Sequence, residues 1–266
     1  MNVLIRRLLT KKPESKHFIL DVSWDKLSVL DDAQAWLRKL DRAYDVYADF
    51  VGGVPYNGKK ITILESTKWN QYWAVAGNPI HWSPAGITEE FERINAGSWS
   101  FGILHEIGHD FDDVQEEGGP APWCWNGEPT ANFKMVFVIE TLPDVVIFSG
   151  NNDKRYGSFS TGHPRIKEMY RIEARRIGDE QQLNFSSIDE LMNRRGDSIT
   201  FHLIDLKDVI GWQPFRLAFR ELRLLPQHKI PSAQLDKLKL FIETVSKHAD
   251  HKYDIRDFLL ERGFPL

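Results

Sequence analysis

The stretch FGILHEIGHDFDD constrains the fold more than any other part of the chain. We predict that it lies on a helix running from 98 to 111. Side chains four residues apart lie on one face of a helix, so His105 and His109 point the same way. Ile107 and Gly108, between the two histidines, favour a buried helix packed closely on a neighbour over a solvated turn.

The paired histidines predict a metal site, because two imidazoles on one helix face can reach the same zinc ion at about 2.0–2.1 Å. Glu106 is rotated from His105 by roughly 100° around the helix. It is therefore not expected to bind the same ion, but it can reach a water molecule held there. This H-E-x-x-H arrangement is typical of a carboxylate base beside a metal-activated nucleophile.

A third ligand is expected from Glu128, which opens a predicted apolar helix over 128–141. Asn132 lies four residues later on the same helix face, where it can orient a ligand histidine by a hydrogen bond. Two histidines and one glutamate leave the fourth position of a tetrahedral zinc open for water. The competing carboxylates, which the sequence favours less, are Asp110, Asp112, Asp113, Glu116 and Glu117.

The placement of charge indicates hydrolysis of an amide. Glu106 is expected to take the proton of the attacking water and later to pass it to the leaving amine. A further donor should stabilise the developing oxyanion. Tyr156, His163 and Tyr170 in the second half of the chain are the candidates, and the sequence does not choose among them.

The remaining pattern predicts an α+β fold with a mixed α/β first half and a helical second half. Residues 26–52 have helical periodicity ended by Gly52 and Gly53, and residues 59–66 alternate like a strand. Residues 70–83 look like a second strand or hairpin arm at the sheet edge, over the active-site helix, where an extended peptide could pair. Further helices are predicted near 164–180, 187–195, 205–224 and 233–248.

Composition limits the class of protein. The chain has 266 residues, of which 42% are hydrophobic and 27% charged, as in ordinary globular proteins. We expect one catalytic unit over 1–266, with a mixed lobe at 1–112 and a mainly helical lobe at 113–266. A net charge of −4 argues against nucleic acid as a partner. Cys124 is the single cysteine, which excludes an intrachain disulfide and a multi-cysteine zinc site.

No apolar run approaches the length of about 18 residues needed to span a bilayer. The N-terminal MNVLIRRLLTKKPESK is too interrupted by charge for a signal-peptide core, so the chain is either cytoplasmic or a fragment of a longer exported protein. Nine tryptophans indicate either an aromatic core or a cleft that stacks on sugar rings. Trp82, Trp123 and Trp125 are the candidates for such a substrate cleft.

The sequence HEIGH followed by W-x-G-E-x-T-x-N resembles the enhancin-like zinc metallopeptidases, which include viral enhancins and bacterial mucin-degrading proteases. AGNPI at 76–80 and DIRDFLLERGFPL at 254–266 are similar to segments of the same catalytic domain. The resemblance covers residues 40–266, and HEIGH with the Glu128 segment is its most specific part. One departure is Asp110, which follows HEIGH where relatives carry an amide- or histidine-rich stretch.

The resemblance implies a zincin-like fold of the gluzincin type, with zinc held by His105, His109 and Glu128 and with Glu106 as the base. It also implies substrates dense in O-linked glycans, such as mucins, and a secreted or cell-surface location. Two alternatives stay open: a catalytically idle relative that binds glycoprotein, and a zinc hydrolase of small peptides or amides. A third reading is that the two histidines hold no metal. The oligomeric state is not predicted.

Overall fold

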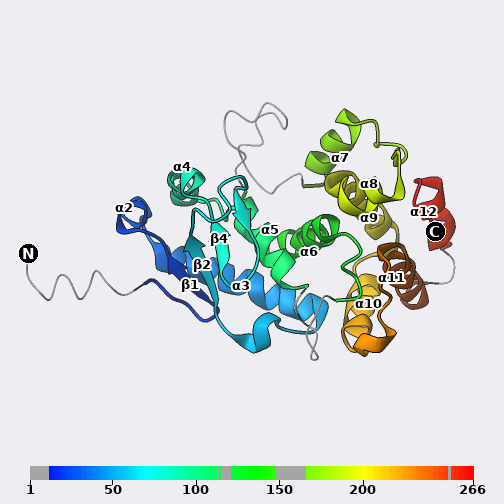
Figure 1. The fold of residues 1–266 in the computed structure, drawn as a ribbon, viewed down its shortest axis with the longest axis horizontal. Helices are drawn as coiled ribbons and strands as arrows, with labels where there is room; N and C mark the ends of the chain where they lie inside the picture. The colour runs from blue at the N-terminus through cyan, green and yellow to red at the C-terminus, as the bar shows by residue number, and fades with distance from the viewer. Residues whose placement is uncertain (1–11, 113, 115–120, 148–165, 251–252) are drawn as a thin grey trace, which may run out of the picture.

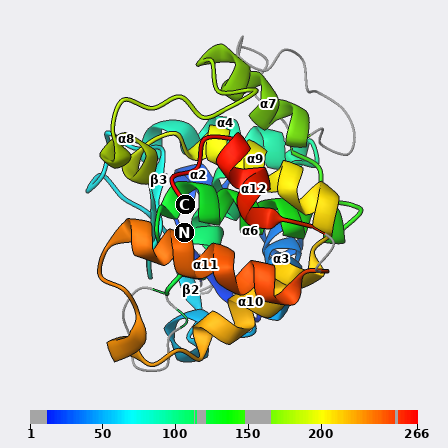
Figure 2. The same ribbon diagram turned by 90° about the vertical axis from the view of Figure 1, so that its right-hand side faces the viewer.

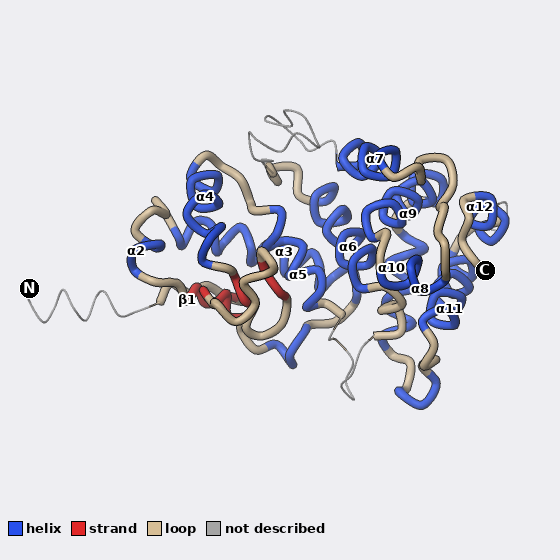
Figure 3. The backbone as a smooth tube through the Cα atoms, turned by 45° about the horizontal axis from the view of Figure 1, so that its top comes forward, coloured by secondary structure: helices blue, strands red, loops and turns tan. Residues whose placement is uncertain are grey.

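Among the residues that the structure describes, strands occur only in the first third of the chain. The computed structural model describes residues 12–112, 114, 121–147, 166–250 and 253–266. Its strands form one sheet at one end of the molecule (Figures 1 and 3). They are β1 (Phe18–Asp21), β2 (Ile61–Glu65), β3 (Ala74–Val75) and β4 (Ile80–Trp82). The order is β1-β2-β4-β3, with β1, β2 and β4 parallel and β3 antiparallel to β4.

The long helix α3 (Ala33–Val51) connects the parallel strands β1 and β2 and packs against β1. Asp32 caps its start by accepting the N–H of Ala35 at 2.8 Å, and Gly52 ends it with a left-handed φ of 74°. The helix predicted over 26–52 is therefore wrong at its start, because the Asp32 cap separates α3 from a short α2 (Trp24–Leu27).

The predicted strand 59–66 is confirmed as β2, and 70–83 forms the β3–β4 hairpin. The edge prediction holds for β3, but β4 lies inside the sheet between β2 and β3. Gly77 and Pro79 fall in the turn, so the missing N–H of proline costs no strand hydrogen bond. The sequence analysis did not predict β1 or α4 (Pro84–Asn95).

Helices and the loops between them make up the described residues from 114 onward. After α5 (Phe101–Asp110) in the sequence, α6 crosses the middle of the molecule, and α7–α12 form the end opposite the sheet (Figures 1 and 2). These helices are α6 (Gly127–Thr141), α7 (Ile166–Arg176), α8 (Ile188–Asn193), α9 (Gly196–Ile210), α10 (Gln213–Arg223), α11 (Gln234–His248) and α12 (Ile255–Glu261). Short 3₁₀ turns occur at Pro55–Gly58 and Gln227–Lys229.

The helix predicted over 205–224 is two helices, because Gly211 takes a φ of 77° after α9 and redirects the chain into α10. Among the described residues, no helix is both long and apolar enough to cross a membrane. The mixed first half and the helical second half of the described chain match the predicted α+β class.

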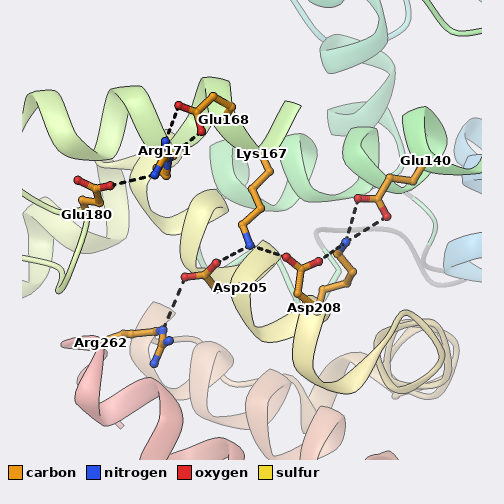
Figure 4. Close-up of polar contacts among 9 residues, drawn as sticks. Glu140, Lys167, Glu168, Arg171, Glu180, Asp205, Asp208 and Arg262 are labelled. Atoms are coloured by element: carbon orange, nitrogen blue, oxygen red, sulfur yellow. Dashed lines mark hydrogen bonds and ion pairs between the residues drawn. The ribbon is translucent and has the colours of Figure 1, made fainter. Parts of the chain in front are cut away.

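Ion pairs link neighbouring helices of the second half (Figure 4). Lys167 of α7 contacts Asp205 of α9 at 2.8 Å, and Lys207 of α9 contacts Glu140 of α6 at 2.9 Å. Arg262 lies 4.0 Å from the same Asp205. Because these side chains are partly solvated, each pair contributes little stability alone, and their effect is to orient α7 and α6 against α9.

Candidate metal centre and active site

Close packing of α5 on α6 creates the site. A Cβ added to Gly108 would lie 2.8 Å from the carbonyl oxygen of Ala131 on α6, so only glycine permits this approach. The two histidines of α5 then face Glu128 at the start of α6. Gly196, the first residue of α9, packs closely against Glu128, since an added Cβ would lie 2.6 Å from the Cβ of Glu128.

The three predicted ligands converge. Nε2 of His109 lies 3.0 Å from Nε2 of His105, and the two nitrogens lie 3.4 and 3.3 Å from the carboxylate oxygens of Glu128. Ligand atoms that bind one ion at about 2.0–2.1 Å with tetrahedral angles are roughly 3.3 Å apart. The donor set and its spacing therefore fit a single small metal ion without rearrangement.

Asn132 orients His105. Its amide nitrogen donates to the carboxylate of Asp197, at 3.3 Å, so its oxygen faces Nδ1 of His105 at 2.8 Å. Because an amide oxygen only accepts, Nδ1 must carry a proton, so the neutral form of His105 has its lone pair on Nε2, where a metal can bind. Asp197, in the first turn of α9, was not predicted from the sequence. It thereby connects the helical half to the site.

The electrostatics separate the two glutamates. Hydrogen bonds from His105 and His109 hold the pKa of Glu128 well below its usual range. Burial would lower the pKa of His105, but Glu128 and Glu106 outweigh it and raise that pKa. Burial raises the pKa of Glu106, which is only 9% exposed, and the nearby backbone N–H of Ala76 lowers it by less.

The site opens to solvent on the Glu128 side. The Glu128 side chain is 58% exposed, whereas those of His105 and His109 are 14% and 19% exposed. Water and a substrate can therefore reach the ligand cluster past Glu128. Within the described part of the chain, this is the one group of three histidine, cysteine or acidic side chains spaced to hold a metal.

Comparison with known proteins assigns the family. The family model described as "Peptidase M60, enhancin and enhancin-like" matches residues 10–260. The chain belongs to the peptidase M60 family. This membership confirms the resemblance seen in HEIGH and the Glu128 segment. A search of curated proteins gives no match to the chain.

Solved structures share the fold of this M60 family member. A functionally unknown conserved protein from Bacillus anthracis str. Ames superposes with a TM-score of 0.60 at 17% identity, covering 98% of this chain and 54% of that one. A mutant of a functionally unknown conserved protein from that source gives 0.60 at 18% identity, with the same coverage. The M60 chain thus spans about half the length of these proteins, and the likeness shows the fold alone.

The competing carboxylates of this M60 chain have other partners. Asp110 accepts hydrogen bonds from Tyr56 and Gly77. Asp112 pairs with the fully buried Lys134 and accepts the indole N–H of Trp123 at 2.7 Å. Asp113, Glu116 and Glu117 lie outside the described residues. Neither Asp110 nor Asp112 belongs to the group of side chains spaced to hold a metal.

The predicted oxyanion donors are not assembled at the site in the described part of the M60 chain. Tyr156 and His163 lie outside the described residues. Tyr170 lies on α7 with no exposed surface, so its hydroxyl is not open to a substrate in this structure.

The substrate-cleft prediction for tryptophan needs correction. Trp82, Trp123 and Trp125 are completely buried in the core, so their rings have no surface to offer a ligand. The exposed aromatic side chains near the sheet edge are different ones, in the segment leading into β3. They are Trp69, Tyr72 and Trp73, which are 37%, 56% and 36% exposed.

Trp73 lies beside the active-site helix of the M60 chain. Its ring occupies the space that a Cβ on Gly86 or Gly102 would need, so it lies directly against α4 and the first turn of α5. Gly102 precedes Glu106 by one helical turn on the same face. The signal in the sequence was the position of Trp73 within the predicted edge segment 70–83, which the tryptophan count alone did not distinguish.

Proposed function

We propose that this M60 family member is a zinc-dependent endopeptidase of the zincin-like, gluzincin type that cleaves O-glycosylated, mucin-like proteins. The observation that carries the proposal is the convergence of His105, His109 and Glu128, with Glu106 beside them. Membership in a peptidase family implies a protein substrate.

His105, His109 and Glu128 would hold the zinc ion. Two neutral imidazoles and a carboxylate are a donor set that zinc favours in catalytic sites, and three protein ligands leave one position for water or substrate. A bound zinc supplies a Lewis acid that polarises a carbonyl oxygen and makes water a better nucleophile. The low pKa of Glu128 keeps that ligand ionised in neutral solution.

Glu106 is assigned the proton transfers. Its carboxylate is buried beside the cluster and oriented by the N–H of Ala76. We assign it the role of taking a proton from the attacking water and giving that proton to the leaving amine nitrogen. Its raised pKa makes the carboxylate a stronger base toward the attacking water, and a pKa nearer neutral pH suits a group that must both accept and donate the proton.

The edge strand β3 is the proposed binding surface for the peptide. Among the described strands, β3 is last in the sheet order, and it contacts α5. An extended substrate could add there as a further strand, with its scissile bond directed at the cluster on α5. Trp73 would flank that peptide with a flat apolar face, which suits an aromatic side chain or the apolar face of a sugar ring.

The test compares a mucin with the same mucin after enzymatic removal of its O-glycans. Purified protein, with its zinc content measured, is incubated with each substrate, and the products are identified by mass spectrometry. Wild type is expected to hold about one zinc per chain and to cleave the mucin, and a chelator should abolish cleavage. Glu106→Gln is the matched control, because it removes the base and leaves the three ligands in place.

Each outcome separates the candidate functions. Slower cleavage after deglycosylation supports a glycoprotein peptidase. Equal or faster cleavage indicates a general peptidase and removes the mucin specificity. A zinc-loaded protein that binds mucin and cleaves neither form is an idle binding relative. A protein that stays metal-free after dialysis against zinc contradicts the proposal.

A further inference from the structure

Two carboxylates of α5, those of Glu106 and Asp110, face the turn at residues 76–77 between β3 and β4. Oδ1 of Asp110 accepts the hydroxyl of Tyr56 at 2.7 Å and the backbone N–H of Gly77 at 2.7 Å. The backbone N–H of the preceding residue in that turn, Ala76, lies close enough to the Glu106 carboxylate to lower its pKa. Glu106 and Asp110 are four residues apart, so both carboxylates lie on the face of α5 that the turn covers.

The side chain of Asp110 is buried, and its hydrogen bonds come from two defined donors, Tyr56 and Gly77. Asp110 is 2% exposed, and its Oδ2 has no hydrogen-bond partner among the described residues. A buried carboxylate costs free energy unless its hydrogen bonds offset the loss of water. Here both donors meet one oxygen, and one of them belongs to the turn between β3 and β4. Retaining a polar group at this cost indicates that it constrains the turn.

The backbone of the turn depends on this constraint. Gly77 has a φ of 130°, a conformation that residues with side chains rarely adopt. If Asp110 did not accept the Gly77 N–H, this partly buried group would lose its partner or the turn would move. Because Ala76 and Gly77 are adjacent, any movement of the turn also moves the N–H that orients Glu106.

We propose that Asp110 is a positioning residue for Glu106, acting through the 76–77 turn. The inference rests on the proposed function, because it assigns Asp110 a part in the same hydrolysis. Asp110 is not one of the three proposed metal ligands. It fixes the turn, the turn fixes the carboxylate of Glu106, and the same turn carries the edge strand β3.

The test uses two nearly isosteric variants. Asp110→Asn keeps one oxygen that can accept both hydrogen bonds, whereas Asp110→Leu fills the same space and accepts none. Tyr47→Phe is the matched control, because it removes a buried hydrogen bond to α5, from the Tyr47 hydroxyl to the carbonyl of Leu104 at 2.8 Å, away from the turn. For each variant, zinc content, melting temperature, kcat and KM are measured.

Asp110→Leu is expected to keep its zinc and to lose kcat on the order of 10- to 100-fold, since small misplacements of a catalytic group have effects of this size. Its KM should change by a much smaller factor. Asp110→Asn should recover most of the lost kcat. Tyr47→Phe should lower the melting temperature and leave kcat unchanged.

Three results would overturn the inference: wild-type kcat in Asp110→Leu, an Asp110→Asn variant as impaired as Asp110→Leu, or loss of zinc from Asp110→Leu. If Asp110→Leu does not fold, amide hydrogen exchange on wild type decides instead. The Ala76 and Gly77 amides should exchange as slowly as those of α5, and exchange at the rate of an open loop contradicts the inference. A wild type without zinc or cleavage would instead sink the proposed function.

Discussion

At the scale of single residues, the two glutamates of the site have opposite environments. Glu128 is half exposed and held ionised by two histidines, as suits a ligand. Glu106 is buried, and burial raises its pKa, as suits a group that must accept and return a proton. Pairs of acidic groups whose surroundings separate their pKa values in this way are typical of acid–base catalysis.

Replacing Glu106 with glutamine tests its role. The amide cannot accept the proton, so kcat is expected to fall by about 10²–10⁴-fold. Zinc content should stay as in wild type, because none of the three ligands changes. Turnover assays alongside metal analysis measure both quantities, and turnover equal to that of wild type would exclude Glu106 from the mechanism.

Replacing Asn132 with alanine tests the orientation of His105. Losing the amide that fixes the Nδ1 proton should weaken zinc binding by about 10–100-fold. Competition with a chromogenic chelator measures the affinity. Thr130→Val is the control on the same helix, since the hydroxyl of Thr130 donates to the carbonyls of Asn126 and Gly127. An Asn132→Ala affinity equal to that of this control contradicts the assignment.

At the scale of elements, the site depends on the separation of two helices. α5 provides both histidines and the base, and α6 provides Glu128 and Asn132. Gly108 sets the distance between them, because its missing side chain leaves room for the backbone of Ala131. The α9 N-terminus supports α6 through Asp197 and Gly196. The relative positions of the metal ligands therefore depend on how closely α5 and α6 pack.

Gly108→Ala is expected to force α5 and α6 apart. Overpacking of this kind typically costs about 1–3 kcal/mol of the free energy of unfolding. Zinc affinity should fall as well, because both histidines shift relative to Glu128. Gly127→Ala is the comparison, since its added Cβ would meet His109 only at 3.4 Å. Denaturant titration and zinc competition measure the two effects, and wild-type values for Gly108→Ala would show that the packing is not tight.

At the scale of the whole molecule, an aromatic cluster connects the two halves of the chain. Phe50 of α3 stacks on Phe137 of α6 with ring centroids 4.0 Å apart. The same ring contacts Trp212 and Phe219 in the helical half, at 5.5 and 5.0 Å. Every residue of α6 from Pro129 to Ile139 is buried. We therefore expect the halves to fold as one unit.

Phe50→Ala tests this connection. Removing a buried phenylalanine should lower the free energy of unfolding by about 3–5 kcal/mol. Wild type should unfold in one transition when far-ultraviolet circular dichroism and tryptophan fluorescence are followed together. Two separate transitions in wild type, or an unchanged stability of the variant, would show that the lobes fold independently.

The sequence by itself determined the parts that depend on local spacing. The i,i+4 histidines, the glutamate between them and the helix carrying Glu128 and Asn132 follow from the 3.6-residue period, which does not need long-range contacts. The bounds of α3 and the break at Gly211 were read less well, because a cap and a left-handed glycine depend on backbone conformation. The family followed from the same local motifs.

Only the tertiary structure decided which groups meet. Trp82, Trp123 and Trp125 are core residues and Trp73 is exposed, although composition treats all tryptophans alike. Asp110 was predicted only as a less favoured metal ligand, yet it accepts a hydrogen bond from a turn 33 residues earlier in the chain. Such contacts join segments far apart in sequence, and their choice depends on how the sheet edge, α5 and α6 pack together. No local pattern encodes that packing.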